Sequence, residues 1–204
     1  MSFYERWMLP WLLDLCMRNK EARRYRERVI PQATGRVLEI GIGSGLNLPF
    51  YGAGVDHLFA LEPSPELRRM AGRRIKGARF PVEFLDHSAE EIPLERASVD
   101  TVVTTWTLCT IPDAMRALEE TRRVLKPSGV LLFVEHGLAP EPRVQAWQHR
   151  LNPVWNRIGG GCNLNRRIDE LIMRSGFQLA DLETEYAKGP KPMSFIYCGR
   201  ARPA

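Results

Sequence analysis

The sequence feature that most constrains the fold of this chain is a short apolar strand that runs directly into three glycines. Residues 37–40 read Val-Leu-Glu-Ile, and Gly41, Gly43 and Gly45 follow at alternating positions. Such a strand is typical of the centre of a parallel sheet that is covered on both faces. Glycines just after it let the backbone turn sharply and approach a ligand where a Cβ atom would collide. An ordinary glycine-rich turn is the alternative interpretation.

Strands and helices alternate along most of the chain. We expect strands at residues 36–40, 58–61, 82–85, 99–106, 130–134, 177–186 and 194–202. This alternation favours an α/β fold with a doubly wound, mostly parallel sheet of seven strands, the last two forming an antiparallel pair at its edge. Between the fifth and sixth strands we expect a helical region interrupted by Pro153 and a further helix over residues 165–175. The length of 204 residues fits one domain, residues 31–204, preceded by a helical cap or lid, residues 1–30.

The N-terminal segment is apolar and aromatic. Phe3, Trp7, Trp11 and Leu15 recur at intervals of four, which places them on one face of a helix. The longest apolar run, residues 7–13, is far shorter than the roughly 20 residues that span a bilayer. Three interpretations are open: a helix packed on the core, a lid over a substrate pocket, or an interfacial helix that touches a membrane surface.

Charge and cysteine usage exclude some classes of function. The net charge of +5 comes mainly from arginines scattered over helical faces, without the interleaved aromatic residues that nucleic-acid binding would favour. The four cysteines show no CxxC pairing and no secretory leader precedes them, which predicts reduced thiols in a cytoplasmic protein. We expect no metal and no nucleic-acid partner.

The spacing of the glycines separates two cofactor classes that bind beside the first strand of such sheets. A dinucleotide site has the pattern G-x-G-x-x-G, which would place a glycine where this chain has Leu46. Glu62 ends the second strand, where a carboxylate can accept hydrogen bonds from both ribose hydroxyls of either cofactor. The G-x-G-x-G spacing and the acidic Glu39 before it favour S-adenosylmethionine.

These motifs together resemble those of the class I S-adenosylmethionine-dependent methyltransferases of type 11, which have a Rossmann-like sheet. Residues 37–45 resemble the motif that cradles the methionine part of the cofactor, and residues 87–94 resemble the loop that cups the adenine. Ser88 stands where many members have Asp, and the backbone N–H of Ala89 could serve instead. The resemblance implies S-adenosylhomocysteine as product. It implies cofactor contacts from Glu39, Gly41, Gly43, Gly45, Asn47, Glu62, Pro63, Ser88, Ala89 and Thr105.

A narrower resemblance lies in the second half of the chain. Residues 135–136, 151–155 and 161–164 are similar to motifs of the membrane-associated alkyl thiol S-methyltransferases of animals. This implies a small hydrophobic acceptor, with a thiol as first choice. Those relatives carry a hydrophobic N-terminal anchor, whereas this chain has only the shorter amphipathic segment, for which peripheral membrane contact is one of the three open interpretations. A lipid-like amine, a quinone or a phenol is the alternative acceptor. A catalytically silent cofactor-binding module is the alternative outside the enzymes.

Methyl transfer from a sulfonium needs an acceptor that is aligned and, for many acceptors, deprotonated. His136 follows the fifth strand and is the candidate general base; orienting a loop is its alternative role. Glu135 could hold the imidazole tautomer of His136. Cys109 and Cys162 are expected as pocket walls, because the reaction needs no covalent enzyme intermediate. The predicted substrate pocket contains Trp7, Trp106, Cys109, Trp147, Cys162 and Asn163.

Overall fold

The computed structural model describes residues 4–204, with the side chains of residues 5 and 6 left aside. Its helices are α1 (Leu9–Cys16), α2 (Lys20–Val29), α3 (Pro65–Ile75), α4 (Ala114–Val124), α5 (Pro142–Ile158) and α6 (Ile168–Arg174). Its strands are β1 (Gly35–Ile40), β2 (Val55–Leu61), β3 (Val82–Leu85), β4 (Val99–Thr105), β5 (Leu125–His136), β6 (Phe177–Tyr186) and β7 (Phe195–Pro203). A π-helical turn (Tyr4–Met8) precedes α1, and short 3-10 turns occur at Ile30–Gln32, Leu48–Phe50 and Lys191–Met193.

The seven strands form a single sheet in the order β3-β2-β1-β4-β5-β7-β6. The first five are parallel, whereas β7 runs antiparallel to both β5 and β6. The predicted doubly wound α/β fold is therefore confirmed, including the antiparallel C-terminal pair at the edge.

Alternate residues of the central strands pack on opposite faces of the sheet. In β1, Leu38 and Ile40 join a core layer with residues of α4 and α6, whereas Val37 joins a second layer with residues of α2. This alternation follows from the period of two in a strand. Because both faces are covered, the central strands consist of apolar residues in succession, as the sequence indicated.

Three predicted helical features differ in the structure. The helical region around Pro153 is one continuous helix, α5, in which Pro153 lies inside. The helix expected over residues 165–175 is shorter, because α6 begins only at Ile168. Residues 18–28 are predicted from their charge to form an exposed helical connection, but Arg26 is buried in α2 beside Tyr25. Arg26 is buried because its guanidinium donates a hydrogen bond to Asn47, which follows the glycine turn.

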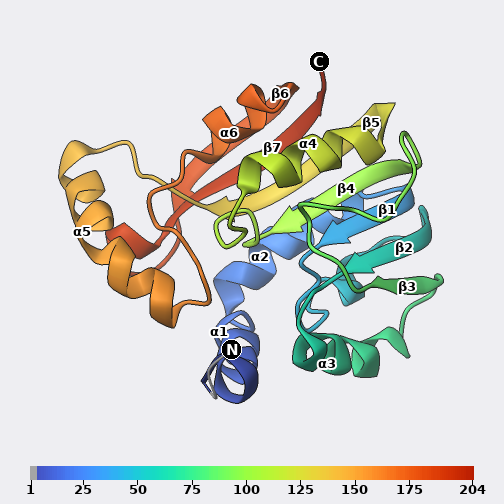
Figure 1. The fold of residues 1–204 in the computed structure, drawn as a ribbon, viewed down its shortest axis with the longest axis horizontal. Coiled ribbons are helices and arrows are strands. Elements are labelled where there is room, and N and C mark those ends of the chain that lie inside the picture. Colours follow the sequence, from blue (N-terminus) through green and yellow to red (C-terminus); the bar gives the residue numbers. More distant parts are fainter. Residues whose placement is uncertain (1–3) are drawn as a thin grey trace.

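The N-terminal helix α1 is not packed into the core. Four of its large apolar side chains or those just before it are about half exposed or more, namely Trp7, Met8, Trp11 and Leu15. Phe3, predicted on the same stripe, lies outside the described residues. Figure 1 shows α1 beyond the edge of the sheet toward which the arrowheads of β1, β2 and β4 point. The core-packing interpretation of this helix is therefore wrong.

Candidate active site

The carboxyl ends of four parallel strands open into one cavity of about 960 Å³. Gly41 follows β1, Glu62 follows β2, Trp106 follows β4, and His136 ends β5; all four line the cavity. Helix α1 closes the cavity on another side through residues that include Leu9, Leu13 and Asp14. Ligands of doubly wound sheets bind at this edge, beside the first strand.

The glycine turn after β1 has a backbone that only glycine adopts easily. Gly41, Gly43 and Gly45 all have positive φ, at 71°, 57° and 83°. A Cβ atom on Gly41 would lie 2.5 Å from the side chain of Thr107, and one on Gly45 would lie 2.9 Å from Leu48. A Cβ atom on Gly43 would meet nothing closer than 3.9 Å. Two of the glycines are therefore required by close packing, whereas Gly43 leaves open space beside the backbone.

Glu62 ties the glycine turn to the end of β2. Its Oε2 accepts a hydrogen bond from the backbone N–H of Gly43 at 3.0 Å, and its Oε1 accepts one from Ser64 at 2.9 Å. Burial raises the pKa of this carboxyl, against the lowering effect of these two hydrogen bonds. A carboxylate has about four acceptor positions, so lone pairs remain for a ligand in the cavity. Pro63 also lines the cavity.

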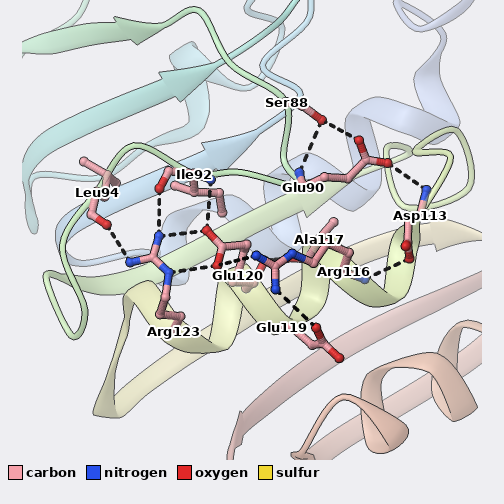
Figure 2. Close-up of polar contacts among 11 residues, drawn as sticks. Ser88, Glu90, Ile92, Leu94, Asp113, Arg116, Ala117, Glu119, Glu120 and Arg123 are labelled. Carbon is pink, nitrogen blue, oxygen red and sulfur yellow. Dashed lines mark hydrogen bonds and ion pairs between the residues drawn. The ribbon is translucent and has the colours of Figure 1, made fainter.

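The loop of residues 86–94 is held in place by helix α4, as Figure 2 shows. Glu90 bridges the Ser88 hydroxyl (2.9 Å) and the backbone N–H of Asp113 (2.8 Å). Arg123 donates to the backbone carbonyls of Ile92 and Leu94, each at 2.7 Å. These contacts place Ser88 and Ala89 in the cavity wall. The Ser88 hydroxyl donates to Glu90, and the backbone N–H groups of Glu90, Glu91 and Ile92 donate to other protein groups. Contact of this loop with a ligand is therefore expected at residues 88–89.

Asn47 is the centre of a buried polar network under the glycine turn. Its Nδ2 donates to Glu39 Oε1 at 2.7 Å and to Thr105 Oγ1 at 3.0 Å, and its Oδ1 accepts from Arg26 at 2.8 Å. Tyr51 donates to the second oxygen of Glu39 at 2.8 Å. Burial raises the pKa of Glu39 to about 7. Asn47 and Thr105 line the cavity, whereas Glu39 lies beneath them and acts through Asn47.

Trp106 has a backbone conformation that is rare for a bulky residue, with φ of 51°. Its ring packs edge-on against Tyr25 at 6.1 Å between centroids, and the Arg26 guanidinium lies 5.2 Å from the ring centroid. Backbone strain of this kind persists where the surroundings hold it, commonly at functional sites. Here it turns the chain at the end of β4 so that Trp106 forms part of the cavity wall.

His136, Cys109 and Cys162 meet at one part of the cavity wall. The Cys162 Sγ lies 3.6 Å from the Cys109 Sγ and 3.8 Å from His136 Nδ1. His136 is buried, and its Nε2 has no hydrogen-bonding partner among residues 4–204. A buried polar atom without a partner in a cavity wall is where a ligand or substrate group is expected to bind.

Glu135 lies beside His136 in the chain and holds the neighbouring loop. Its Oε1 accepts from the Thr104 hydroxyl at 2.7 Å and from the backbone N–H of Thr107 at 3.1 Å. Burial raises the pKa of Glu135 to about 7, against these hydrogen bonds. The side chain makes no hydrogen bond with His136 and does not line the cavity, so it supports the loop of residues 106–109 instead of the His136 imidazole.

An aspartate in the apolar N-terminal helix anchors α1 to the rest of the molecule. Asp14 accepts a hydrogen bond from the Ser44 hydroxyl in the glycine turn at 2.6 Å and pairs with Arg74 of α3 at 3.0 Å and with Arg18. Burial raises the pKa of Asp14, but the hydrogen bonds from Ser44 and Arg18 and the charge of Arg74 lower it more, so the net shift is downward. Arg26 adds a second anchor, since it also donates to the Met17 carbonyl at 2.8 Å.

The structure brings most of the predicted site residues together. The members that line the cavity are Gly41, Gly43, Asn47, Glu62, Pro63, Ser88, Ala89, Thr105, Trp106, Cys109, His136 and Cys162. Gly45 lies behind them, packed on Ala71 of α3. Asn163 donates to the carbonyls of Cys109 and Gly161 and so joins two loops. Trp7 and Trp147 are 48% and 54% exposed and are not in the cavity wall. Helical spacing does not tell which face of a helix is turned inward.

The sequence did not reveal the residues that hold α1 against the glycine turn and α3, namely Asp14, Arg26, Ser44 and Arg74. One signal was available, because Asp14 is a single acidic residue within a run of apolar ones. A charge in such a position is retained when it has a buried partner. Two of the partners of Asp14, Ser44 and Arg74, lie 30 and 60 positions away in the chain, so only the tertiary structure identifies them.

The cavity fits the cofactor that the sequence motifs imply. Its volume lies within the roughly 300–1,000 Å³ of ligand sites. One part of the cavity is lined by Gly43, which has open space beside its backbone, by Glu62 and by residues 88–89. The unpartnered Nε2 of His136 belongs to the wall of another part. Among the described residues there is no group of three metal-ligating side chains.

Comparison with known proteins agrees with this geometry. A model of a methyltransferase domain matches residues 38–133. The chain is 32% identical to thiol S-methyltransferase TMT1B of Rattus norvegicus over 80% of its length and 66% of that protein. It is also 32% identical to TMT1B of Homo sapiens, over 82% of its length and 69% of that protein. The chain thus spans about two thirds of the length of the curated relatives it matches.

The fold also matches that of a solved structure at low sequence identity. An S-adenosylmethionine-dependent methyltransferase from Thermotoga maritima superimposes with a TM-score of 0.68 at 19% identity, covering 98% of each chain. At this identity the likeness concerns the fold alone. It agrees with the mixed seven-stranded sheet described above.

Proposed function

The chain belongs to the S-adenosylmethionine-dependent methyltransferases, and from this premise we propose that it methylates the sulfur atom of a small hydrophobic thiol. The observation that carries the proposal is one cavity that joins the glycine turn and Glu62 to the group of His136, Cys109 and Cys162. The similarity to the thiol S-methyltransferase TMT1B supports a thiol as the acceptor. The alternative acceptors have weaker support: a demethylmenaquinone methyltransferase matches at 30% identity over only 57% of the chain, and a phosphatidylethanolamine N-methyltransferase at 26% identity.

The protein contributes binding, alignment and exclusion of water. S-adenosylmethionine, when bound, supplies a methyl group on positively charged sulfur, and S-adenosylhomocysteine is the product. Gly43, Glu62 and residues 88–89 are placed to hold it. The wall at Trp106, Cys109 and Cys162 offers an apolar and sulfur-lined surface for an acceptor, and α1 covers the cavity. Holding two reacting atoms in line can lower the activation free energy by several kcal/mol, at best by roughly 7–11 kcal/mol.

His136 is the proposed general base. A thiol becomes a good nucleophile once deprotonated, and the unpartnered Nε2 of His136 is a suitable acceptor for that proton. Replacing His136 with Gln should flatten the pH dependence of methyl transfer and lower its rate about 10²-fold or more. Methyl transfer by the variant should be followed across a pH series beside the unchanged protein. A parallel pH profile with a lower plateau would assign His136 to a structural role.

Turnover identifies the acceptor class. Purified protein is incubated with methyl-labelled cofactor and a panel of alkyl thiols, phenols, amines and lipid extracts. We expect labelled product from hydrophobic thiols. Product from phenols or lipids alone would reject the thiol, and no product from any acceptor would favour a silent cofactor-binding module.

We further propose that residues 1–30 act as a lid whose outer face touches a membrane surface. Trp11 and Leu15 are 51% and 68% exposed on α1, and an exposed apolar stripe with tryptophan suits a lipid interface. Among residues 4–204 there is no helix with the length and apolar character needed to cross a bilayer. The proposed contact is peripheral, at the surface of the membrane.

Vesicle sedimentation tests this contact. We expect the chain to bind anionic phospholipid vesicles and the double change Trp11→Ala and Leu15→Ala to weaken that binding. Met173→Ala is the matched control, because Met173 is 48% exposed on α6, a different helix. Equal binding by all three proteins would reject the lid as the membrane contact.

A further inference from the structure

Two thiols face each other in the wall of the cavity, although they are 53 positions apart in the chain. Cys109 lies in the loop after β4, and Cys162 lies in the glycine-rich turn after α5. Their Sγ atoms are 3.6 Å apart. Both line the cavity, so a small molecule that enters it reaches both sulfurs.

The backbone around the pair holds the two sulfurs at this separation. Asn163, directly after Cys162, donates to the Cys109 carbonyl from its backbone N–H at 2.8 Å and from its side-chain amide at 3.0 Å. A disulfide has an S–S length of about 2.05 Å, so the sulfurs need to approach by about 1.5 Å. Side-chain rotation and a shift of the glycine-rich turn of residues 159–161 would supply this approach.

The surroundings of the two thiols are unequal. His136 Nδ1 lies 3.8 Å from the Cys162 sulfur. The hydrogen bond between the two thiols lowers the pKa of Cys162, and contact with His136 lowers it further, against the effect of burial. The same hydrogen bond, together with burial, raises the pKa of Cys109. A thiolate beside a histidine is the reactive form of cysteine, so Cys162 is the attacking sulfur of the pair.

We propose that Cys162 and Cys109 form a reactive dithiol that undergoes exchange with the disulfides of small hydrophobic thiols. The Cys162 thiolate attacks one sulfur of R–S–S–R, forms a mixed disulfide with it and releases R–S⁻, which takes up a proton. Cys109 then loses its proton and attacks the Cys162 sulfur, forming the Cys109–Cys162 disulfide and releasing the second R–SH. The small disulfide gains two electrons, and the two cysteines supply them. Two equivalents of a small thiol reverse both steps and restore the dithiol.

This chemistry goes beyond methyl transfer but uses the same cavity. Each exchange releases R–SH inside the cavity in which a thiol acceptor is proposed to bind. Because Cys109 is only 2% exposed, the pair selects molecules small enough to enter. The exchange needs no methyl donor, so its failure would leave the methyl-transfer proposal standing, and the reverse also holds.

Intact-protein mass measurement without cofactor tests the proposal. The experiment uses a Cys16→Ser background, since Cys16 is an exposed thiol that also borders the cavity. On treatment with a small dialkyl disulfide this protein should lose about 2 Da, the mass of two hydrogen atoms, and release two equivalents of thiol. Adding Cys109→Ser should stop the reaction at one retained R–S group on Cys162. Adding Cys162→Ser should slow it at least tenfold.

Other outcomes would overturn the proposal. These are an unchanged mass in the Cys16→Ser protein, a stable mixed disulfide without ring closure, or equal reactivity of the Cys109→Ser and Cys162→Ser variants. Circular dichroism before treatment verifies that each variant is folded. Cys198→Ser in the same background is the matched control, because Cys198 is a buried cysteine outside the cavity; it should leave the loss of mass unchanged.

Discussion

At the scale of single residues, the site depends on buried polar groups whose partners are backbone atoms or other site residues. Glu62 holds two backbone N–H groups, Asn47 joins Arg26 to Glu39, and His136 leaves one nitrogen without a partner. Buried polar atoms are costly when unsatisfied, so such arrangements define the geometry of a site closely. His136 Nε2 and Trp155 Nε1 are among the buried atoms of the described residues that have no partner, and both residues line the cavity.

Replacing Glu62 with Ala should weaken cofactor binding. Hydrogen bonds to a charged group contribute roughly 1.5–3 kcal/mol each, so a loss of about 10–100-fold in affinity for S-adenosylhomocysteine is expected. Isothermal titration measures this loss. Glu62→Gln is the matched variant, since it keeps one acceptor oxygen and should lose less. Affinity equal to that of the unchanged protein would show that the ribose is held by other residues.

At the scale of elements, α1 depends on one buried charge more than on its apolar face. The apolar stripe of α1 faces outward, whereas Asp14 on the other side joins Ser44 of the glycine turn and Arg74 of α3. Asp14 therefore connects α1 directly to the glycine turn. Opening of α1 is expected to release Ser44, and binding of cofactor at the turn is expected to favour closure.

Replacing Asp14 with Ala should loosen the lid. The loss of a buried, charged acceptor is expected to cost about 1.5–3 kcal/mol of the free energy that keeps α1 closed. Hydrogen exchange should then show lower protection of the amides of residues 9–16, while the sheet stays protected. Arg18→Gln is the control, because Arg18 is 52% exposed and such pairs contribute only about 0–1 kcal/mol. Equal protection in Asp14→Ala and the unchanged protein would contradict the anchor.

At the scale of the whole molecule, two carboxyl groups buried at the sheet affect stability as a function of pH. Burial raises the pKa of Glu39 and of Glu135 from 4.5 to about 7. The folded protein then binds more protons than the unfolded chain between about pH 4.5 and pH 7. The contribution of each group to the free energy of unfolding is full below this window and is lost as the pH rises through it. The lowered pKa values of Asp14, Asp100 and Glu120 act in the opposite direction, but in more acid solution.

Glu135→Gln should therefore reduce the loss of stability between pH 5 and pH 8. A group with a raised pKa contributes a slope of up to about 1.4 kcal/mol per pH unit within its window. Urea unfolding of the variant and the unchanged protein at both pH values measures the difference. Glu39→Gln should act in the same way, and the double variant should show the smallest pH dependence. An unchanged pH dependence in both single variants would contradict the buried, protonated state.

Local signals in the sequence predict the succession of strands and helices along the chain. They also predict which residues form the cofactor-binding part of the proposed site. The run of Val37 to Ile40, the glycine spacing and Glu62 are local signals, because a strand, a turn and a residue at a strand end depend on neighbours in the chain. The alternation of strands and helices determined the doubly wound fold in the same way. Pro153 misled this reasoning, since α5 continues through it although proline removes a hydrogen bond from a helix.

Only the tertiary structure decided which way α1 faces, what anchors it and which side chains meet in the cavity. Trp7 and Trp147 are large aromatic residues of the kind expected in a substrate pocket, but their side chains are exposed. Asp14, in contrast, is buried by partners from two other segments. Cys109 and Cys162 come into contact because two loops, separated by β5 and α5, end at the same edge of the sheet. Contacts between distant segments depend on how the layers pack, and local periodicity carries no information about them.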